Sequence, residues 1–389
     1  FAWKAHQDLF SEDTTISNLK LRLGWGITGQ QDIGDDNLDL FWDKYIKGNP
    51  VAQYQFGKNL IPIGIPQFRN ENLKWEETTT YNAGFDIGIL EDRYTLSIDF
   101  FRKESRDLLV DAAVADGSNF SNVGFQNIGE FTSQGAEFVL QGDVLTAEDS
   151  NQLQWNASLN GSLIRTEVTS LFQGQDLLKG IAAGGTGVET QIHRIGYTPY
   201  SFFVYKQIYD SNGNPIENTY ADLNGDKQIN QDDRYIHHNN QPSLSLGFAS
   251  SFSYKNFDLS FNARAVIGNY VYNNINSSRA QYDLIANGSV LYNLPKSIEQ
   301  TNFSTTSNVI LSDYYIENAS FFRVDNVSLG YNFKEIFNSN VDFRLSTSVQ
   351  NLLVVTNYSG LDPEVFNNGI DNAIYPRPRT FLINANIQF

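Results

Sequence analysis

The chain has 389 residues, a formal net charge of −17 and a pI of about 4.6. This acidity excludes nucleic acid as an expected partner, because nucleic-acid-binding domains carry basic patches. The absence of cysteine excludes disulfides and thiolate metal sites. No run of 18 apolar residues occurs, so we expect no transmembrane helix, but shorter strands of alternating polarity could still cross a membrane.

Strict alternation of apolar and polar residues marks the predicted strands of the N-terminal half. In the first of them, Leu19, Leu21 and Leu23 alternate with Lys20 and Arg22. A period of two places all apolar side chains on one face of a strand. Five segments of this kind follow one another at residues 18–27, 81–89, 94–101, 135–144 and 153–163.

The C-terminal half repeats the pattern and brings the predicted number of strands to ten. The further segments are residues 244–254, 257–267, 326–333, 341–350 and 381–389. Their polar faces are rich in Asn, Ser, Gly, Asp and Arg, whereas the opposite faces are aliphatic and aromatic. A polar inside and an apolar outside are typical of an antiparallel up-and-down β-barrel in contact with outer-membrane lipid. A soluble β-sandwich is the alternative.

The lengths of the connections alternate strictly. Short links at 90–93, 146–152, 254–257 and 334–340 separate long links at 30–77, 109–131, 167–241, 271–319 and 359–379. All long loops therefore fall on one rim of the predicted barrel, and all short turns fall on the other. Outer-membrane barrels have long extracellular loops and short periplasmic turns. We expect the last strand to end on the periplasmic side with Phe389 facing outward.

Several stretches resemble SusC-like (SusC/RagA-type) TonB-dependent transporters, the outer-membrane importers of Bacteroidetes. They are "NLKLRLGWGITGQQDI" (18–33), "NENLKWEETTTYNAGFDIGIL" (70–90), "NIGEFTSQGAEFVL" (127–140), "SVQNLLVVTNYSGLDPEV" (348–365) and "YPRPRTFLINANIQF" (375–389). Gln31 and Glu71 depart from the family's usual Asn and Pro. The resemblance implies that residues 1–389 are the C-terminal part of a 22-stranded barrel, with the plug domain and the earlier strands outside this chain.

The resemblance also implies a function. Such a transporter imports oligosaccharides or oligopeptides with a SusD-like surface lipoprotein, is driven through TonB, and assembles as a dimer of transporter–lipoprotein pairs. It is not an enzyme. The alternatives are a siderophore or cobalamin receptor without a lid, a passive porin, and a hydrolytic barrel.

A calcium-like loop lies in the longest predicted extracellular loop, at "ADLNGDKQINQDD" (221–233). Oxygen ligands spaced as in a calcium-binding loop would come from Asp222, Asn224, Asp226, Gln228 (through its carbonyl), Asn230 and Asp233. Against calcium, Lys227 occupies the sixth position, where Gly is expected for the sharp turn. The alternative is an Asx-rich surface turn without metal.

Aromatic residues crowd the predicted long loops, where their faces could stack on a glycan or peptide substrate. The alternatives are packing within the loops and contact with the lipoprotein. The candidate substrate-binding residues are Trp42, Tyr45, Tyr200, Phe203, Tyr205, Tyr314 and Tyr315.

Overall fold

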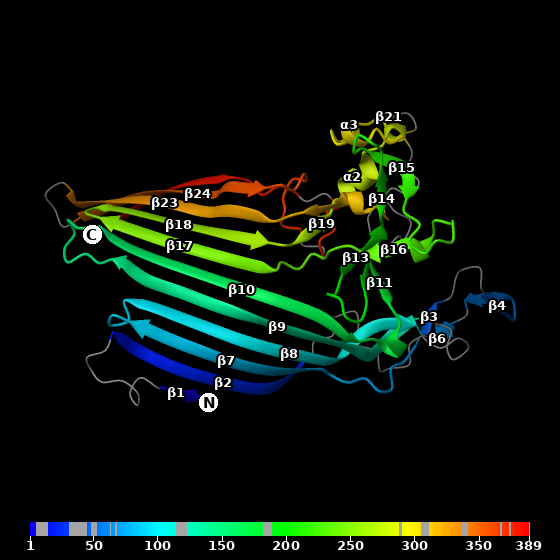
Figure 1. Ribbon diagram of the computed structural model, residues 1–389, viewed down its shortest axis with the longest axis horizontal. Coiled ribbons are helices and arrows are strands. Elements are labelled where there is room, and N and C mark those ends of the chain that lie inside the picture. The colour runs from blue at the N-terminus through cyan, green and yellow to red at the C-terminus, as the bar shows by residue number, and fades with distance from the viewer. Residues whose placement is uncertain are drawn as a thin grey trace.

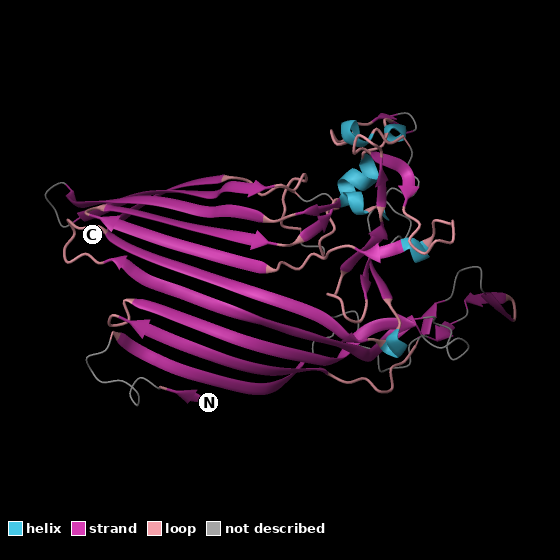
Figure 2. Cartoon of the chain, in the orientation of Figure 1, coloured by secondary structure: helices cyan, strands magenta, loops and turns pink. Residues whose placement is uncertain are grey.

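One large antiparallel sheet dominates the computed structural model (Figure 1 and Figure 2). The structure describes residues 1–4, 15–30, 45–47, 53–62, 64–66, 68–113, 123–181, 189–287, 290–304, 311–336, 341–365, 368–372 and 375–388. In spatial order the strands of the sheet are β1 (Ala2–Trp3), β2 (Ile16–Gln30), β7 (Glu76–Ile89), β8 (Tyr94–Ala113), β9 (Val123–Leu145), β10 (Gln154–Ser170), β17 (Leu244–Tyr254), β18 (Phe257–Ile267), β23 (Phe321–Ile336), β24 (Val341–Thr356) and β25 (Thr380–Gln388).

All ten predicted strands are confirmed, and most extend beyond their predicted ends. The apolar pattern of β10 stops at Leu163 because the next outward-facing residues, Arg165 and Glu167, are charged. The strand itself continues to Ser170. β1 was not predicted, since two residues cannot show a period. β1 and β25 lie at the two edges of the sheet, and no pairing joins them among the described residues. The strands therefore form an open wall and not a closed ten-stranded barrel.

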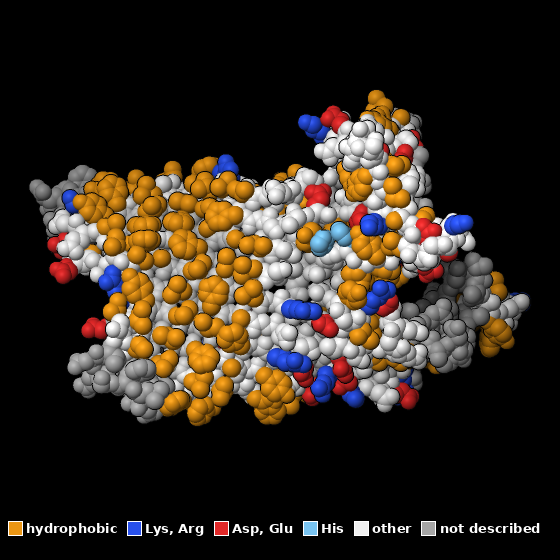
Figure 3. All heavy atoms as spheres, viewed as in Figure 1, with side chains coloured by type: hydrophobic (Ala, Val, Ile, Leu, Met, Phe, Trp, Pro, Cys, Tyr) orange, Lys and Arg blue, Asp and Glu red, His pale blue; other side chains and the backbone are white. Residues whose placement is uncertain are grey.

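The two faces of the wall have different chemistry, as the alternation predicts. Large apolar side chains stand exposed on the outer face, for example Trp25 (67%), Phe100 (51%) and Leu163 (48%). Figure 3 shows them as a continuous band over the long strands. A patch of this size is foreign to a water-facing surface, whereas lipid is its natural solvent. No described helix is long and apolar enough to cross a membrane.

The described connections follow the predicted parity. Short turns lie at one end of the wall, near the C-terminus, and long excursions lie at the other end (Figure 1). The turn between β7 and β8 is tight, with positive φ at Leu90, Glu91 and Asp92. Residues 337–340 and Phe389 lie outside the described residues, so the predicted outward orientation of Phe389 stays a prediction.

The long loops fold into a structure of their own, which the sequence did not predict. We call the described parts of residues 171–243, 268–320 and 357–379 the loop cap. Its elements are η2 (Phe172–Gly174), β11 (Leu177–Ile181), β12 (Glu189–His193), β13 (Ser201–Tyr205), β14 (Gln207–Tyr209), β15 (Pro215–Tyr220), η3 (Gln231–Asp233), β16 (Arg234–Ile236), β19 (Tyr270–Tyr272), α2 (Asn274–Arg279), η4 (Tyr282–Leu284), β20 (Ala286–Asn287), β21 (Val290–Leu291), α3 (Ile298–Thr301), η6 (Asp313–Tyr315) and β22 (Ile316–Asn318).

A second, smaller projection comes from the loop between β2 and β7. It contains two short pairs, β3 with β6 and β4 with β5, and it extends beyond the wall in Figure 1. The bounds of these strands are β3 (Tyr45–Lys47), β4 (Gln53–Phe56), β5 (Asn59–Pro62) and β6 (Gly64–Pro66).

The main hydrophobic core lies in the loop cap. It draws on all three long loops, and its buried members are Phe202, Val204, Tyr272, Phe303, Tyr315, Ile316 and Ile370. Backbone hydrogen bonds join the loops around this core: the Tyr272 N–H donates to the Gly369 carbonyl (2.8 Å), and the Asp371 N–H donates to the Tyr272 carbonyl (3.0 Å). Burial of each large apolar side chain contributes about 1.5–3 kcal/mol, so the cap can hold its shape above the wall.

Candidate functional site

Ion pairs cross the inner face of the wall. The Arg22 guanidinium on β2 donates to Asp86 on β7 (2.9 Å) and to Asp99 on β8 (2.7 Å). Gly84 lies between Arg22 and Asp99 in the register, and a Cβ there would stand 2.4 Å from Asp99 Oδ1. The missing side chain therefore opens the path by which Arg22 reaches across a whole strand.

The same arrangement recurs in the C-terminal half. Arg344 on β24 contacts Asp258 on β18 (2.5 Å), passing over Gly330 on β23. A Cβ at Gly330 would lie 2.5 Å from Arg344 Nη2 and 2.7 Å from Asp258 Oδ1. Each of these ion pairs spans three neighbouring strands on the face that would line the lumen.

A larger charged cluster fixes the segment after β24 to the wall. Arg264 on β18 donates to Glu364 Oε1 (2.5 Å) and also contacts Asp325 (2.9 Å). Arg323, only 3% exposed, donates to Asp362 (2.7 Å). Buried charges need such pairing, because leaving one of them alone is strongly unfavourable. Sequence reasoning missed this cluster, although Asp362 and Glu364 lie within the recognised "GLDPEV" stretch.

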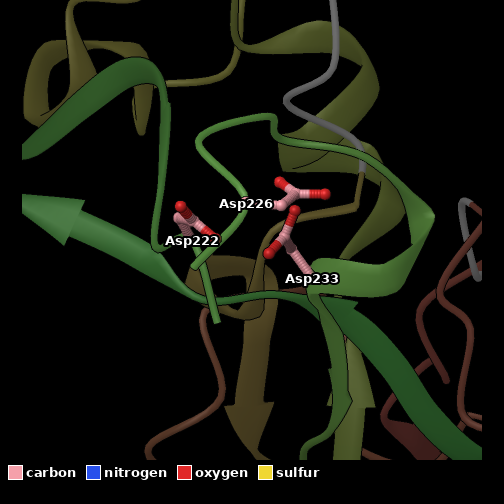
Figure 4. Close-up of side chains that lie close together, drawn as sticks. All are labelled: Asp222, Asp226 and Asp233. Carbon is pink, nitrogen blue, oxygen red and sulfur yellow. The ribbon is translucent and has the colours of Figure 1, made fainter. Parts of the chain in front are cut away.

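The acidic loop lies in the cap between β15 and β16. Asp222, Asp226 and Asp233 each offer a carboxylate oxygen within 4.8 Å of the other two, and Figure 4 shows the three side chains drawn together. Asp233 has no exposed surface, whereas Asp226 lies at the surface. The structure therefore brings together three of the six residues that the sequence predicted as ligands.

Backbone donors hold the loop in this shape. Asp222 accepts the N–H groups of Gly225 (2.6 Å) and Lys227 (2.8 Å). Asp233 accepts those of Asn230 (3.0 Å) and Leu223 (2.8 Å), and these bonds, the one from Asn230 above all, lower the pKa of Asp233. A carboxylate kept ionised in this way is suited to holding a cation.

The remaining ligands predicted in this loop contact their neighbours. Asn224 Oδ1 accepts the Asp226 N–H (2.9 Å), and Asn230 Oδ1 accepts the Asp232 N–H (2.7 Å) as the cap of η3. The Gln228 N–H donates to Asp226 Oδ1 (2.8 Å). These are Asx-type turns, so the metal-free alternative has a physical basis as well.

Lys227 adopts the backbone conformation that the sixth position of a calcium loop requires. Its φ is +65°, in the left-handed region that favours glycine. The residue type is therefore unusual, but the turn itself forms. The three carboxylates that lie together are hard oxygen donors, the kind of ligand that Ca²⁺ takes.

The aromatic candidates in the cap divide into buried and accessible residues. Phe203 is 6% exposed and lies against the Arg234 guanidinium (4.4 Å to the ring centre), and Tyr315 is 2% exposed within the core. Their rings pack inside the cap in this structure and offer no free face to a substrate. For these two residues the alternative of packing within the loops applies, because burial removes the stacking surface.

The other candidates keep part of their surface accessible. Tyr45 is 68% exposed on β3. Tyr200 contacts His193 edge to face (4.5 Å), Tyr205 stacks on Tyr220 (5.1 Å), and Tyr314 packs partly against the core. Trp42 lies outside the described residues. Of the described candidates, Tyr314 and Tyr315 contact each other edge to face (5.1 Å between ring centres).

Side-chain hydrogen bonds that the sequence did not predict join two of the cap loops. The Tyr235 hydroxyl donates to Asp313 Oδ2 (2.6 Å) and lies 3.0 Å from His237 Nδ1. Burial lowers the pKa of His237. Elsewhere in the cap, burial lowers the pKa of His193 to about 4, which keeps this imidazole neutral.

Known proteins resemble this chain in sequence and in fold. The family model described as "TonB dependent receptor-like, beta-barrel" matches residues 15–352. TonB-dependent receptor SusC of Bacteroides thetaiotaomicron is 39% identical over 399 residues, covering 100% of this chain and 39% of that protein. TonB-dependent receptor P3 of Formosa agariphila is 29% identical, covering 100% of this chain and 41% of the relative. The chain thus spans about two fifths of the length of these curated relatives.

A solved structure shows the same fold. The structure of the RagAB peptide transporter superposes on this chain with a TM-score of 0.77 at 21% identity, covering 99% of this chain and 42% of that chain. This likeness confirms the predicted transmembrane β-barrel architecture of the wall.

Proposed function

Because the chain belongs to the TonB-dependent receptor-like β-barrel family and is SusC-like in sequence, we propose that it is part of an outer-membrane importer of oligosaccharides or oligopeptides. Its location is the outer membrane of a Bacteroidetes-type bacterium. The observation that carries the proposal is the 39% identity to SusC along the entire chain. The description of RagAB as a peptide transporter favours the inclusion of oligopeptides.

In this proposal, the chain supplies wall and rim for a longer protein. Exposed sheet edges are intolerable in lipid because their N–H and C=O groups have no water to bond. The edges at β1 and β25 therefore pair with further strands of a barrel of about 22 strands. TonB acts on a plug domain elsewhere in that protein, and no covalent chemistry is needed in this chain.

The loop cap is the proposed docking face for a SusD-like lipoprotein. Its preformed core presents a stable surface, which lowers the ordering cost of binding. Trp42, Tyr45, Tyr200, Tyr205 and Tyr314 remain the proposed substrate contacts at the rim. The complete assembly is proposed to contain two transporter–lipoprotein pairs, and a native mass equal to one pair would contradict that number.

Calcium in the acidic loop is a further part of the proposal. Asp222, Asn224, Asp226 and Asp233 would hold the ion with their side-chain oxygens, assisted by Gln228 and Asn230. A bound ion would neutralise the clustered carboxylates and fix a long extracellular loop. Calorimetric titration with CaCl₂ tests this directly: we expect binding that disappears in Asp226→Asn, and no heat at millimolar calcium would contradict it.

An uptake experiment tests the transport function. Cells that lack the full-length gene should lose uptake of a labelled oligosaccharide or oligopeptide mixture, and deletion of TonB should have the same effect. Uptake that persists without TonB would instead identify a porin. Loss of only iron–siderophore or cobalamin uptake would identify a receptor of the other class, and turnover of the substrate by purified protein would identify a hydrolase.

A further inference from the structure

Three consecutive rungs of outward-facing residues cross the wall from β2 to β10 at its cap end. The strand register places each set of five directly side by side. The rung farthest from the cap is apolar, the middle one contains two arginines, and the rung nearest the cap contains two glutamates. In order from β2 to β10 they are Leu23, Ala83, Phe100, Ala136 and Leu163; Trp25, Tyr81, Arg102, Gln134 and Arg165; and Ile27, Thr79, Glu104, Thr132 and Glu167.

The middle rung lies at the border of the membrane. Its β2 and β7 members, Trp25 and Tyr81, are 67% and 46% exposed aromatics that adjoin the apolar band. Exposed Trp and Tyr at such a border mark the level of lipid headgroups in membrane barrels. In Figure 3, blue and red side chains gather just beyond the apolar band, over the cap-side parts of β8 to β10. Arg102 and Arg165 therefore stand where the headgroups of the outer leaflet lie.

The glutamates contact the two arginines but leave some of their N–H groups without a partner among the described residues. Arg102 donates through Nε to Glu104 (2.9 Å), and its two terminal nitrogens have no hydrogen-bond partner among the described residues. Arg165 approaches Glu167 only to 3.5 Å. The two arginine side chains are 55% and 74% exposed. Both guanidinium groups thus keep free donors, whose planar fork matches a phosphate.

A hollow adjoins these donors at the end of β10. The pairing of β10 with β17 stops at Ser162, so β10 loses its neighbour on that side before Arg165 is reached. The resulting space of about 710 Å³ is lined from the outer face by Gln134, Leu163 and Arg165, and from the inner face and the cap by residues such as Phe101, Ile164 and Gln241. On the outer side, the Gln134 amide can bond hydroxyls of a sugar or glycerol headgroup, and Leu163 can meet the start of an acyl chain.

We propose that Arg102, Gln134 and Arg165 bind the phosphate-bearing headgroup of an outer-leaflet lipid whose headgroup carries a net negative charge. The order of chemistry along the wall matches such a lipid: apolar residues for the chains, cations for the phosphate, and carboxylates beyond it to position the cations. The chain has a net charge of −17 and therefore repels anions overall. Two arginines with free N–H groups provide a local positive site at this level of the wall.

The test uses the full-length transporter purified in dodecyl maltoside. Native mass spectrometry measures how much monophosphoryl lipid A is retained during titration. Arg102→Gln with Arg165→Gln should weaken retention about 25-fold, since each cation near a headgroup contributes about five-fold. The single Arg165→Gln variant should weaken it about five-fold. Heat-modifiable migration on gels checks that each barrel is folded.

Two controls separate this site from general electrostatics. Lys103→Gln with Lys206→Gln removes the same charge from the opposite face of β8 and from the cap, and should change retention less than two-fold. Glu104→Gln should maintain or raise retention, because it frees Arg102 and Arg106, which both contact Glu104. Loss of retention in Glu104→Gln would show that a cation bridged by carboxylates, and not the arginines, holds the lipid, and would overturn the proposal.

The probe also distinguishes the source of the phosphate. Inorganic phosphate at 10-fold excess over the lipid should not displace it, and zwitterionic phosphatidylcholine should be retained equally by all variants. Displacement by inorganic phosphate would identify a site for free anions and contradict a lipid site. Equal retention of monophosphoryl lipid A by the double-arginine variant and the wild type would contradict it as well.

Discussion

The wall and the loop cap use the same residue types in opposite ways. Phe100 on β8 is 51% exposed, whereas Phe202 in the cap has no exposed surface. In the wall, apolar side chains face lipid and charged groups pair on the inner face. In the cap, apolar side chains such as Phe202 form a buried core, and buried polar groups such as Asp233 are held by hydrogen bonds. The solvent beside each region therefore decides which side chains are exposed, and the two regions owe their stability to different interactions.

Truncation of a core aromatic should separate the two regions most strongly. Phe202→Ala leaves a cavity at the centre of the cap core, and we expect it to destabilise the cap by about 3–5 kcal/mol. The lipid-facing control Phe100→Ala creates no internal cavity and should leave both regions folded. Limited proteolysis reports on the cap, and heat-modifiable gel migration reports on the barrel.

The expected result is rapid cleavage within residues 171–243 of the Phe202→Ala variant while the barrel stays intact. If the barrel unfolds together with the cap, the two regions form one cooperative unit. The claim that cap and wall are stabilised separately would then be wrong.

A methyl group added to the inner face of the wall should have the next largest effect. Gly84→Ala places a Cβ against Arg22 and Asp99, so the ion pair across β7 must break or shift at a cost of about 1–3 kcal/mol. Gly26→Ala is the matched control, since nothing lies within 4 Å of its added Cβ. We expect a lower midpoint of thermal barrel unfolding for Gly84→Ala alone; equal midpoints for the two variants would show that the pair contributes nothing.

Acidification should weaken the cap and leave the wall unchanged. The folded cap holds the pKa of His193 at about 4, below its ordinary value of 6.5. The unfolded cap therefore takes up a proton first, and cap stability should be complete above about pH 6.5 and fall as the pH drops toward 4. Protease resistance of the cap at pH 7 and pH 5 measures this. His193→Gln should flatten the difference, and a wild-type cap equally resistant at both values would contradict the account.

Replacement of Lys227 by glycine should give the smallest effect and refine the account of the acidic loop. Since φ at Lys227 is +65°, Lys227→Gly should relieve about 1 kcal/mol of backbone strain and tighten calcium binding about five-fold. Gln231→Gly is the control, because Gln231 is not a proposed ligand, its φ is not positive and glycine only adds chain entropy. Weaker calcium binding by Lys227→Gly in calorimetry would show that the lysine side chain itself supports the loop.

The wall could be predicted from sequence because its determinants are local. A period of two identifies each strand, and alternating loop lengths place every loop on its rim. The acidic loop could be found for the same reason, since Asp222 and Asp233 lie within one short stretch. The rungs at the membrane border needed the strand register, because Arg102 and Arg165 belong to different strands.

The cap could not be predicted because its core is assembled from distant segments. Phe202, Tyr272 and Ile370 come from three loops separated by barrel strands, and no periodicity connects them. The same lack of local signal explains why Phe203 and Tyr315 were grouped with exposed aromatic candidates. The pairing of Arg264 with Glu364 likewise joins residues 100 positions apart.

Purification of the tagged full-length protein from outer membranes in mild detergent shows whether the loop cap binds a SusD-like lipoprotein. We expect a SusD-like lipoprotein to co-purify in a one-to-one ratio and to cross-link to residues of the loop cap. A transporter that purifies alone under these conditions, or whose lipoprotein cross-links only outside residues 171–243, 268–320 and 357–379, would contradict the proposed role of the cap.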